Sequence, residues 1–276
     1  MKILTIPITI DGTNGEYRVD VYGDTHFATK GVDAQRLKKD IQETKKSGRA
    51  WVHAGDVIDG ILPGERRWNV MYTDALCDWA WNSHQKGNLI EAEWREFKRQ
   101  FMPIARQCIT VCAGDGKHNE FRDVADPFKN SLEEMGIKDG GYIGYVLDFR
   151  FKRGESTSIK SMRVMLHHSR IAGSKENKMR HMRRVLQNFH NIDAFICGHG
   201  HDKVQTRIDN LDIVRGGEIQ VIRRAAMTGS YLRTYTKNIQ GYGEMALFDP
   251  IALGRISLVL RPFCNDPEKR VEFENM

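Results

Sequence analysis

The sequence has few cysteines, and they are not arranged as a zinc or disulfide framework requires. The five cysteines are an odd number and include no pair at CxxC spacing. Cys112 and Cys197 lie in apolar runs, where a free thiol behaves as a small hydrophobic side chain. The pattern argues against a zinc knuckle and a disulfide-stapled fold, and it favours a reducing compartment.

Long apolar runs are also missing. The alternating apolar run at the N-terminus stops at Asp11, which is too short for a transmembrane helix, and no small-residue cleavage site follows it. We interpret this run as a strand and predict a cytoplasmic protein that makes no membrane contact. The 276 residues contain no internal repeat and no low-complexity linker. They therefore predict a single domain over 1–276, long enough to bury a sizeable core.

The charge balance is basic. The chain carries a formal net charge of +6 and has a pI of about 9.0. A basic balance favours polyanionic partners, nucleic acid above all. Charge does not indicate an oligomeric state, which stays open.

Apolar runs alternate with helical periodicity, which is typical of an α/β domain. Amphipathic helices are expected at 33–46 and 175–189. Strands are expected at 19–22, 50–54, 109–113, 162–166 and 194–197. The chain turns strand-rich beyond His201, with runs at 204–208, 212–214, 219–226, 242–248 and 255–260.

A tryptophan-rich helical insertion is expected at about 65–106, between the second and third of these strands. It carries Trp68, Trp79, Trp81 and Trp94, and it is far longer than one crossover helix needs. Two interpretations remain open. The segment is either an ordinary helical layer whose tryptophans pack in the core, or a lid that offers aromatic faces to bases beside an active site.

Each of the first five expected strands after the N-terminal run leads directly into residues that bind metals. The five segments are GDTH at 23–26, GDVID at 55–59, GDGKHNE at 114–120, HH at 167–168 and GHGH at 198–201. Ligands of open α/β sheets bind at the carboxyl ends of the strands. Asp and His together suit Zn, Fe, Mn or Ni. Burying so many ionisable groups without a metal would cost several kcal/mol, so the series predicts a metal site.

This ordered series resembles the calcineurin-like metallophosphoesterase family over residues 19–203. The segments 167–177 and 228–254 resemble its prophage-type members. The resemblance implies a four-layer α/β/β/α sandwich with two mixed β-sheets. It also implies a hydrolase of phosphate esters that uses two divalent metal ions and attacks with a metal-bridging hydroxide. Manganese is the expected metal, with Fe, Zn or Ni as alternatives.

The resemblance also assigns metal ligands in this sequence. Asp24, His26 and His201 bind one metal, while His167 and His199 bind the other. Asp56 bridges both. A bridging carboxylate can hold two cations about 3.5–4 Å apart, the separation that in-line attack on a phosphate requires.

The third motif departs from the family pattern. By resemblance, His118 is the catalytic residue that assists the leaving group. The family places an asparagine ligand directly before that histidine, whereas this chain has Lys117, which cannot ligate a metal when protonated. We assign the missing ligand to Asn119, with Asp115 or neither residue as the alternatives.

Several neighbouring residues stay outside the assigned ligand set. At the paired histidines His167 is chosen as the ligand, and His168 is left as a contact behind it or to the substrate. Asp59 is expected to orient a ligand or to cap a helix. His53 lies outside every motif and is interpreted as structural.

The substrate class is the least specified feature. The stretch 175–184 carries five basic side chains, which suit either a solvated helix face or a track for a phosphate backbone. With the basic pI, this favours a phosphodiesterase or nuclease that acts on nucleic acid. The alternatives are a nucleotide or protein phosphomonoesterase and a catalytically silent nucleic-acid-binding protein on the same fold.

Overall fold

Two mixed β-sheets packed face to face form the centre of the molecule. The computed structural model describes residues 1–276 except 13–14, 115–126, 215–216, 240–243 and 245–246. One sheet has six strands, in the order β1 (Lys2–Ile10), β5 (Gly144–Arg153), β6 (Ile159–His167), β7 (Ala194–Cys197), β9 (Gly217–Met227) and β8 (Val204–Val214). The other has five, in the order β11 (Val271–Glu274), β10 (Ile256–Leu260), β2 (Tyr17–Tyr22), β3 (Ala50–His53) and β4 (Cys108–Val111).

The core lies between the inner faces of the two sheets. Val19 and Val21 of β2 point into it from the five-stranded sheet. Leu147 of β5 and Val164 and Leu166 of β6 meet them from the six-stranded sheet. Because side chains alternate along a strand, the residues between these positions face the outer layers of helix.

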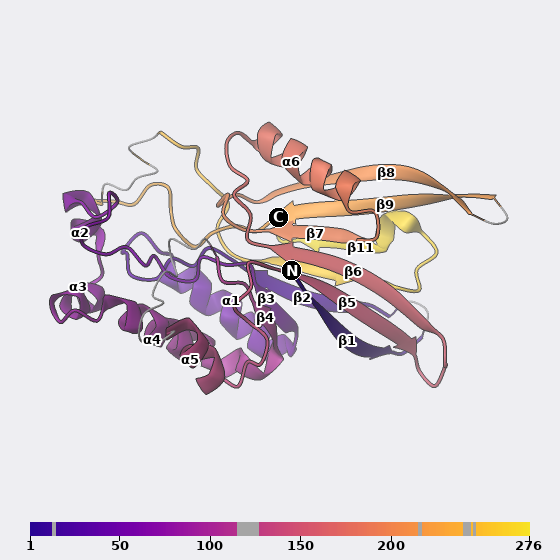
Figure 1. Ribbon diagram of the computed structural model, residues 1–276, viewed down its shortest axis with the longest axis horizontal. Coiled ribbons are helices and arrows are strands. Elements are labelled where there is room, and N and C mark those ends of the chain that lie inside the picture. Colours follow the sequence, from indigo (N-terminus) through magenta and orange to yellow (C-terminus); the bar gives the residue numbers. More distant parts are fainter. Residues whose placement is uncertain (13–14, 115–126, 215–216, 240–243, 245–246) are drawn as a thin grey trace.

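Helices cover both outer faces, so the layer order is α/β/β/α (Figure 1). On the six-stranded sheet, α6 (Lys175–Asn188) buries Met182 and Leu186 against strands β7–β9. On the five-stranded sheet, α1 (Ala34–Ser47) buries Leu37 and Ile41, and α4 (Leu89–Phe101) packs Phe97 and Phe101 beside β2 and β3. The expected four-layer sandwich is confirmed.

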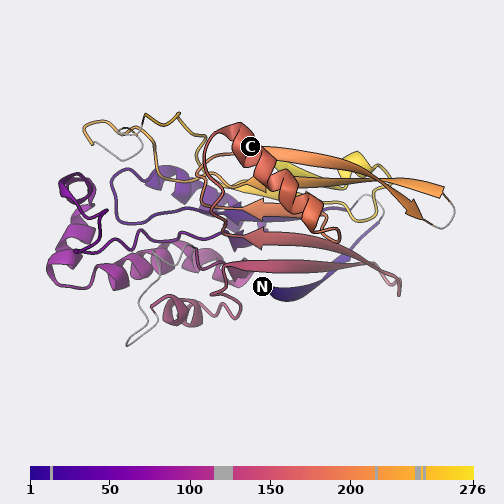
Figure 2. The ribbon, with the colours of Figure 1, turned by 45° about the horizontal axis from the view of Figure 1, so that its top comes forward.

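The segment between β3 and β4 is helical, as expected. It forms α2 (Val70–Ala75), α3 (Asp78–Gln85), α4 and the 3-10 helix η1 (Met102–Gln107). Trp94 is buried in the outer core, whereas Trp81 is 39% exposed. Figure 2 shows α2 and α3 beyond the sheets, at the end to which the arrowheads of β6 and β7 point. The core interpretation therefore holds for Trp94, and the lid interpretation stays a prediction.

Most expected elements are present, and two expectations need correction. The expected strand at 242–248 lies largely outside the described residues. The strand β5 was missed, although its run of alternating residues fits a strand whose inner face is buried. The segments 204–208 and 212–214 are not separate strands but parts of β8, because β9 pairs with β8 along its whole length. The remaining helices are α5 (Pro127–Glu134) and the 3-10 helix η3 (Pro267–Lys269).

A buried ion pair fastens α1 and β10 to the centre of the five-stranded sheet. Arg255 is 3% exposed and donates to Asp20 Oδ1 at 3.0 Å and to Glu43 Oε2 at 2.9 Å. Asp20 is fully buried and also accepts from Thr44 and Ser257, at 2.7 Å each. Removing one partner of such a pair leaves an uncompensated buried charge.

We therefore expect Arg255→Met to lower the free energy of unfolding by about 3–5 kcal/mol, measured by urea denaturation. The matched control is Arg207→Met, because Arg207 pairs with Glu268 at the surface and is 45% exposed at its side chain. The control should lose less than about 1 kcal/mol. Equal, small losses in both variants would contradict a stabilising role for the buried pair.

Candidate metal centre

The metal-binding segments lie at the carboxyl ends of strands, as the sequence predicted. The segments at 23–26, 55–59 and 198–201 follow β2, β3 and β7, and the paired histidines lie at the end of β6. Strands β2, β3 and β4 run parallel in one sheet, and β6 and β7 run parallel in the other. Parallel strands end at the same edge of a sheet, which brings these loops together.

The first group consists of Asp24, His26 and His201, and each member offers one ligand atom toward the others. His26 Nε2 lies 2.9 Å from His201 Nε2, and Asp24 Oδ1 lies 3.5 Å from that same His201 nitrogen. The backbone N–H of His199 donates to both carboxylate oxygens of Asp24, at 3.0 and 3.1 Å. The structure thus brings together all three residues that the sequence assigned to one metal.

The second group consists of Asp56, His168 and His199. Asp56 Oδ2 lies 3.1 Å from His168 Nε2 and 3.7 Å from His199 Nδ1. Both Asp56 and His168 are buried. The structure therefore brings Asp56 and His199 together as expected, with His168 as the third member.

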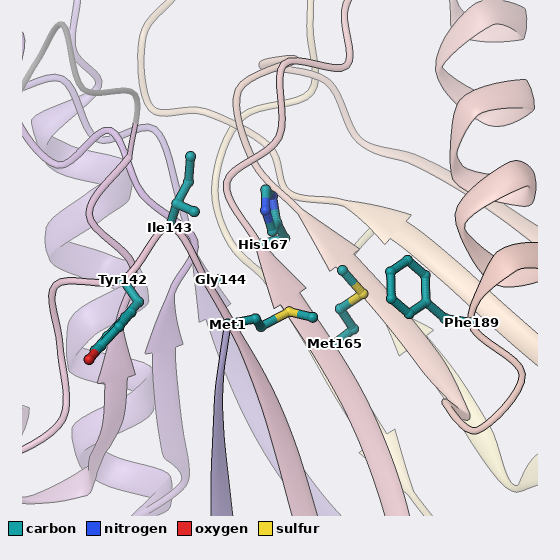
Figure 3. Close-up of a pocket in the computed structure, with 7 residues that line it drawn as sticks. All are labelled: Met1, Tyr142, Ile143, Gly144, Met165, His167 and Phe189. Carbon is teal, nitrogen blue, oxygen red and sulfur yellow. The ribbon is translucent and has the colours of Figure 1, made fainter.

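His167, the residue expected as a ligand, belongs to neither group. It is the last residue of β6 and follows Leu166, which faces the core. The His167 ring therefore faces the outer side of the sheet, as the side chain of Met165 does (Figure 3). The chain leaves the strand at His168, and only this second ring turns into the site. The expected His118, Asn119 and Asp115, together with Lys117, lie outside the described residues.

Hydrogen bonds fix the ring nitrogen that each buried histidine offers. His26 Nδ1 lies 3.0 Å from Asp59 Oδ1, so its N–H donates there and Nε2 is left for a metal. His168 Nδ1 donates to the carbonyl of Ala54 at 2.8 Å, which again leaves Nε2. Histidine ligands of metals typically donate their second N–H to a carboxylate or a backbone carbonyl in this way.

Electrostatics of the site favour a bound cation. Burial raises the pKa of Asp24 to about 6, despite the opposing effect of His168. Burial alone would lower the pKa of His26, but the hydrogen bond and charge of Asp59, with the charges of Asp56 and Asp24, raise it to about 9. His26 thus retains a proton among buried carboxylates. A metal cation could replace that proton at the same site.

Backbone conformation sets these residues apart. Among the described residues other than glycine, nine have a positive φ, and five of the nine belong to the two groups, with φ between 43° and 75°. These are Asp24, His26, Asp56, His199 and His201. Such conformations cost about 1–3 kcal/mol each and cluster at functional sites, where the surrounding structure enforces them.

Two glycines make room for the groups. A Cβ on Gly55, whose φ is +107°, would collide with the ring of His168, and one on Gly114 would collide with Asp56. The glycine before each ligand segment is therefore a steric requirement at these two positions. Two carboxylates and four histidines meet at the carboxyl ends of strands from both sheets. This set of side chains fits a pair of divalent cations.

His53 plays a larger part than its lack of a motif suggested. It is fully buried, and its Nδ1 accepts from the backbone N–H of Gly55 at 3.2 Å. Its Nε2 lies 3.3 Å from Thr25 Oγ1, and Thr25 donates to the carbonyl of Val57 at 2.8 Å. Burial and the charge of His168 lower the pKa of His53 to about 3, which keeps the ring neutral. The neutral ring joins the loops that carry Asp24 and Asp56.

The helical insertion also supports the site, through Glu93 of α4. Glu93 is fully buried, and its Oε2 accepts from the backbone N–H of Gly60 at 3.1 Å, next to Asp59. Burial and the charge of Asp59 raise the pKa of Glu93 well above its usual range. Nothing in the sequence indicated this role for Glu93, because the residue lies on a helix far from every motif.

Comparison with known proteins adds little. No family model matches the chain, and no curated protein matches it significantly. One similar solved structure is YfcE, a phosphoesterase from E. coli, with 12% identity, 90% of this chain and 89% of that chain covered, and a TM-score of 0.34. Another is GAP50, the anchor in the inner membrane complex of Plasmodium, with 11% identity, coverages of 89% and 81%, and a TM-score of 0.38. Similarities this distant carry no argument about the site, which depends on the residues of this chain.

No helix among the described residues combines the length and the apolar character that crossing a bilayer requires.

Adjacent histidines provide a direct test of the second group. We expect His168→Ala to lose one of two bound metal ions, with an affinity loss larger than the roughly 10- to 100-fold typical of residues behind a ligand. His167→Ala is the matched control and should retain both. Metal content and calorimetric titration with Mn²⁺ measure the difference. If His167→Ala lost a metal ion and His168→Ala retained both, His167 would be the ligand instead.

Glu93 provides a test by pH. The folded protein keeps the Glu93 proton above the ordinary pKa of 4.5, whereas the unfolded chain releases it, so the parent loses stability as pH rises. We expect Glu93→Gln to remove this loss. Its free energy of unfolding relative to the parent should rise between pH 5 and pH 8, by at most about 1.4 kcal/mol per pH unit. Glu91→Gln, at an exposed position of the same helix, should show no such trend. If the free energies of unfolding of Glu93→Gln and the parent changed in parallel with pH across this range, Glu93 would not retain its proton in the folded protein.

Proposed function

We propose that this protein is a metal-dependent phosphoesterase of the calcineurin-like metallophosphoesterase type, and that it hydrolyses phosphodiesters of nucleic acid. The observation that carries this proposal is the pair of Asp/His groups where loops of the two sheets meet. Five of the six members have a strained positive φ. The order of the motifs along the sequence supports it independently.

The proposed ligand sets are Asp24, His26 and His201 for one cation and Asp56, His168 and His199 for the other. Two bound divalent cations would supply an activated water near neutral pH and neutralise the charge that develops on the phosphate. We propose Asp56 as the residue between the two sites, because its charge also raises the pKa of Asp24 and His26 in the first group. Manganese is the metal that we would test first.

The chain's own residues orient the centre before any substrate arrives. Asp59 and the carbonyl of Ala54 hold the rings of His26 and His168 with Nε2 facing inward. His199 anchors Asp24 through its backbone N–H. A preorganised site of this kind lowers the cost of stabilising charge in the transition state. By resemblance, we propose His118 as the residue that protonates the leaving oxygen and Asn119 or Asp115 as a further ligand.

Nucleic acid is the proposed substrate because of the basic charge and the position of α6. Lys178 donates to the carbonyl of Gly200 at 3.0 Å, which ties α6 to the loop of His199 and His201. Lys178 and Arg183 are engaged within the protein, the latter with Thr206 at 2.6 Å. Among the basic side chains of α6, Lys175, Arg180, Arg183 and Arg184 are exposed, and Arg183 is held by Thr206. We propose that this basic face contacts phosphates flanking the cleaved bond.

We further propose that the protein works in the reducing cytoplasm. All five cysteines are free thiols in the structure, and Cys112 and Cys197 are buried. Burial raises the pKa of Cys197 to about 12, which keeps it as an unreactive thiol.

The deciding experiment is hydrolysis of an oligonucleotide and of a phosphomonoester model compound with and without Mn²⁺. We expect metal-dependent cleavage of the diester, loss of cleavage with a chelator, and recovery on addition of Mn²⁺. Asp56→Asn should lower turnover at least about 100-fold, because it weakens both metal sites. Asp74→Asn, at an exposed position of α2, is the control and should retain full activity.

Each remaining outcome selects a different function. Cleavage of the monoester alone would indicate a phosphomonoesterase. Salt-sensitive DNA binding without any Mn²⁺-dependent cleavage, unaffected by Asp56→Asn, would indicate a catalytically silent binding protein and would overturn the proposed activity.

A further inference from the structure

A cavity of about 240 Å³ opens on the outer face of the six-stranded sheet, beside the region that α6 covers (Figure 3). Its lining comes from the start of β1, the segment leading into β5, the end of β6 and the residue that follows α6. The lining residues are Met1, Tyr142, Ile143, Gly144, Met165, His167 and Phe189.

Two features create this cavity: the register between β5 and β6, and the position at which α6 ends. Gly144 of β5 pairs with His167 of β6, and a Cβ at Gly144 would collide with the His167 ring. The His167 ring therefore lies over Gly144, in the space that a side chain at residue 144 would fill. Met165 lies two residues earlier on the same face of β6, and α6 ends just before Phe189. No helix among the described residues covers the sheet at this point.

Segments that line the cavity are hydrogen-bonded to segments of the candidate metal centre. His167 precedes the proposed ligand His168, whose backbone N–H donates to the carbonyl of Ile143 at 2.8 Å. On the adjacent wall, Ala113 donates to the carbonyl of Tyr142 at 3.0 Å. Ala113 leads into Gly114, which packs against Asp56. Two walls of the cavity are therefore built from segments that also position metal ligands.

The chemistry of the lining selects a flat, uncharged group. Tyr142 and Phe189 are 52% and 43% exposed, which leaves their rings available for stacking. Met165 adds a polarizable thioether, and His167 is the one lining side chain with ring nitrogens that can recognise a polar edge. No carboxylate, lysine or arginine side chain contributes to the lining, and Met1 brings the positively charged N-terminal amino group near the His167 ring. Within nucleic acid, only the base combines a planar apolar face with a polar edge.

We propose that this cavity binds a nucleobase that flanks the cleaved phosphodiester. The proposal rests on the proposed function, because a phosphate held at the metal centre is what brings the base to the adjacent cavity. The His167 ring, which lies outside the metal site, then belongs to the recognition of the substrate.

The test compares a DNA oligonucleotide with the same strand made abasic around the cleaved position. In the variant Tyr142→Ala/Phe189→Ala, kcat/KM for the normal strand should fall about 5- to 100-fold, the range that stacking of one base corresponds to. The loss should lie in KM, and cleavage of the abasic strand should stay at the parent level. Leu211→Ala is the control, since Leu211 is 62% exposed on the β8–β9 hairpin.

Two outcomes of this comparison overturn the proposal. Equal losses on the normal and abasic strands would mean that the two rings shape the metal centre and do not read a base. Unchanged cleavage of both strands would mean that no base occupies the cavity. Circular dichroism of the variant establishes that either result comes from a folded protein.

A binding measurement separates the cavity from the catalytic proposal. Adenosine carries a base and no phosphate, so its titration, followed by NMR, reports on the cavity alone. Binding that the double variant abolishes supports the base site even if the parent cleaves no diester, in which case only the proposed function fails. Two results together would overturn the base site: the parent binds no adenosine, and it sediments as a dimer that the double variant converts to monomers. They would identify this face as a contact between two copies of the chain.

Discussion

Face-to-face packing of the two sheets brings the ends of β2 and β3 opposite the ends of β6 and β7. The core side chains between the sheets, such as Val21 and Leu166, set the separation across which the two sets of loops meet. Residues distant in the sequence become neighbours, so that Asp24 accepts hydrogen bonds from His199. The candidate metal centre is thus a consequence of core packing, and a shift between the sheets would separate its Asp and His side chains.

Much of the support for this centre lies outside the ligands themselves. His53 joins the loops of Asp24 and Asp56 beneath the site, while Asp59 and the carbonyl of Ala54 select the ring nitrogens. Glu93 of the helical insertion reaches the same loop through Gly60. The strained backbone at the ligands is stable only because these contacts surround it. The insertion is therefore coupled to the site through hydrogen bonds, whether or not it also acts as a lid.

The paired histidines show why one part of the site was beyond sequence reasoning. Alternation along β6 places Leu166 in the core and His167 on the outer face, so only His168 can turn inward. A one-residue error in register reverses every side chain of a strand. The sequence gives the end of a strand only within a few residues, and two identical neighbouring residues offer nothing to choose between. Glu93 was missed for a related reason, since a helical glutamate resembles any solvated one.

The sequence by itself determined the α/β class, the order of the metal-binding segments and the convergence of Asp24, His26, Asp56, His199 and His201. These follow from local rules, because apolar runs form strands and parallel strands present their carboxyl ends at one edge. Tertiary structure alone decided that His168, and not His167, lies beside Asp56 and His199, that His53 and Glu93 support the loops, and that a cavity opens on the outer face of β6. Those outcomes depend on register, on the end of α6 and on contacts between distant segments, which no local pattern encodes.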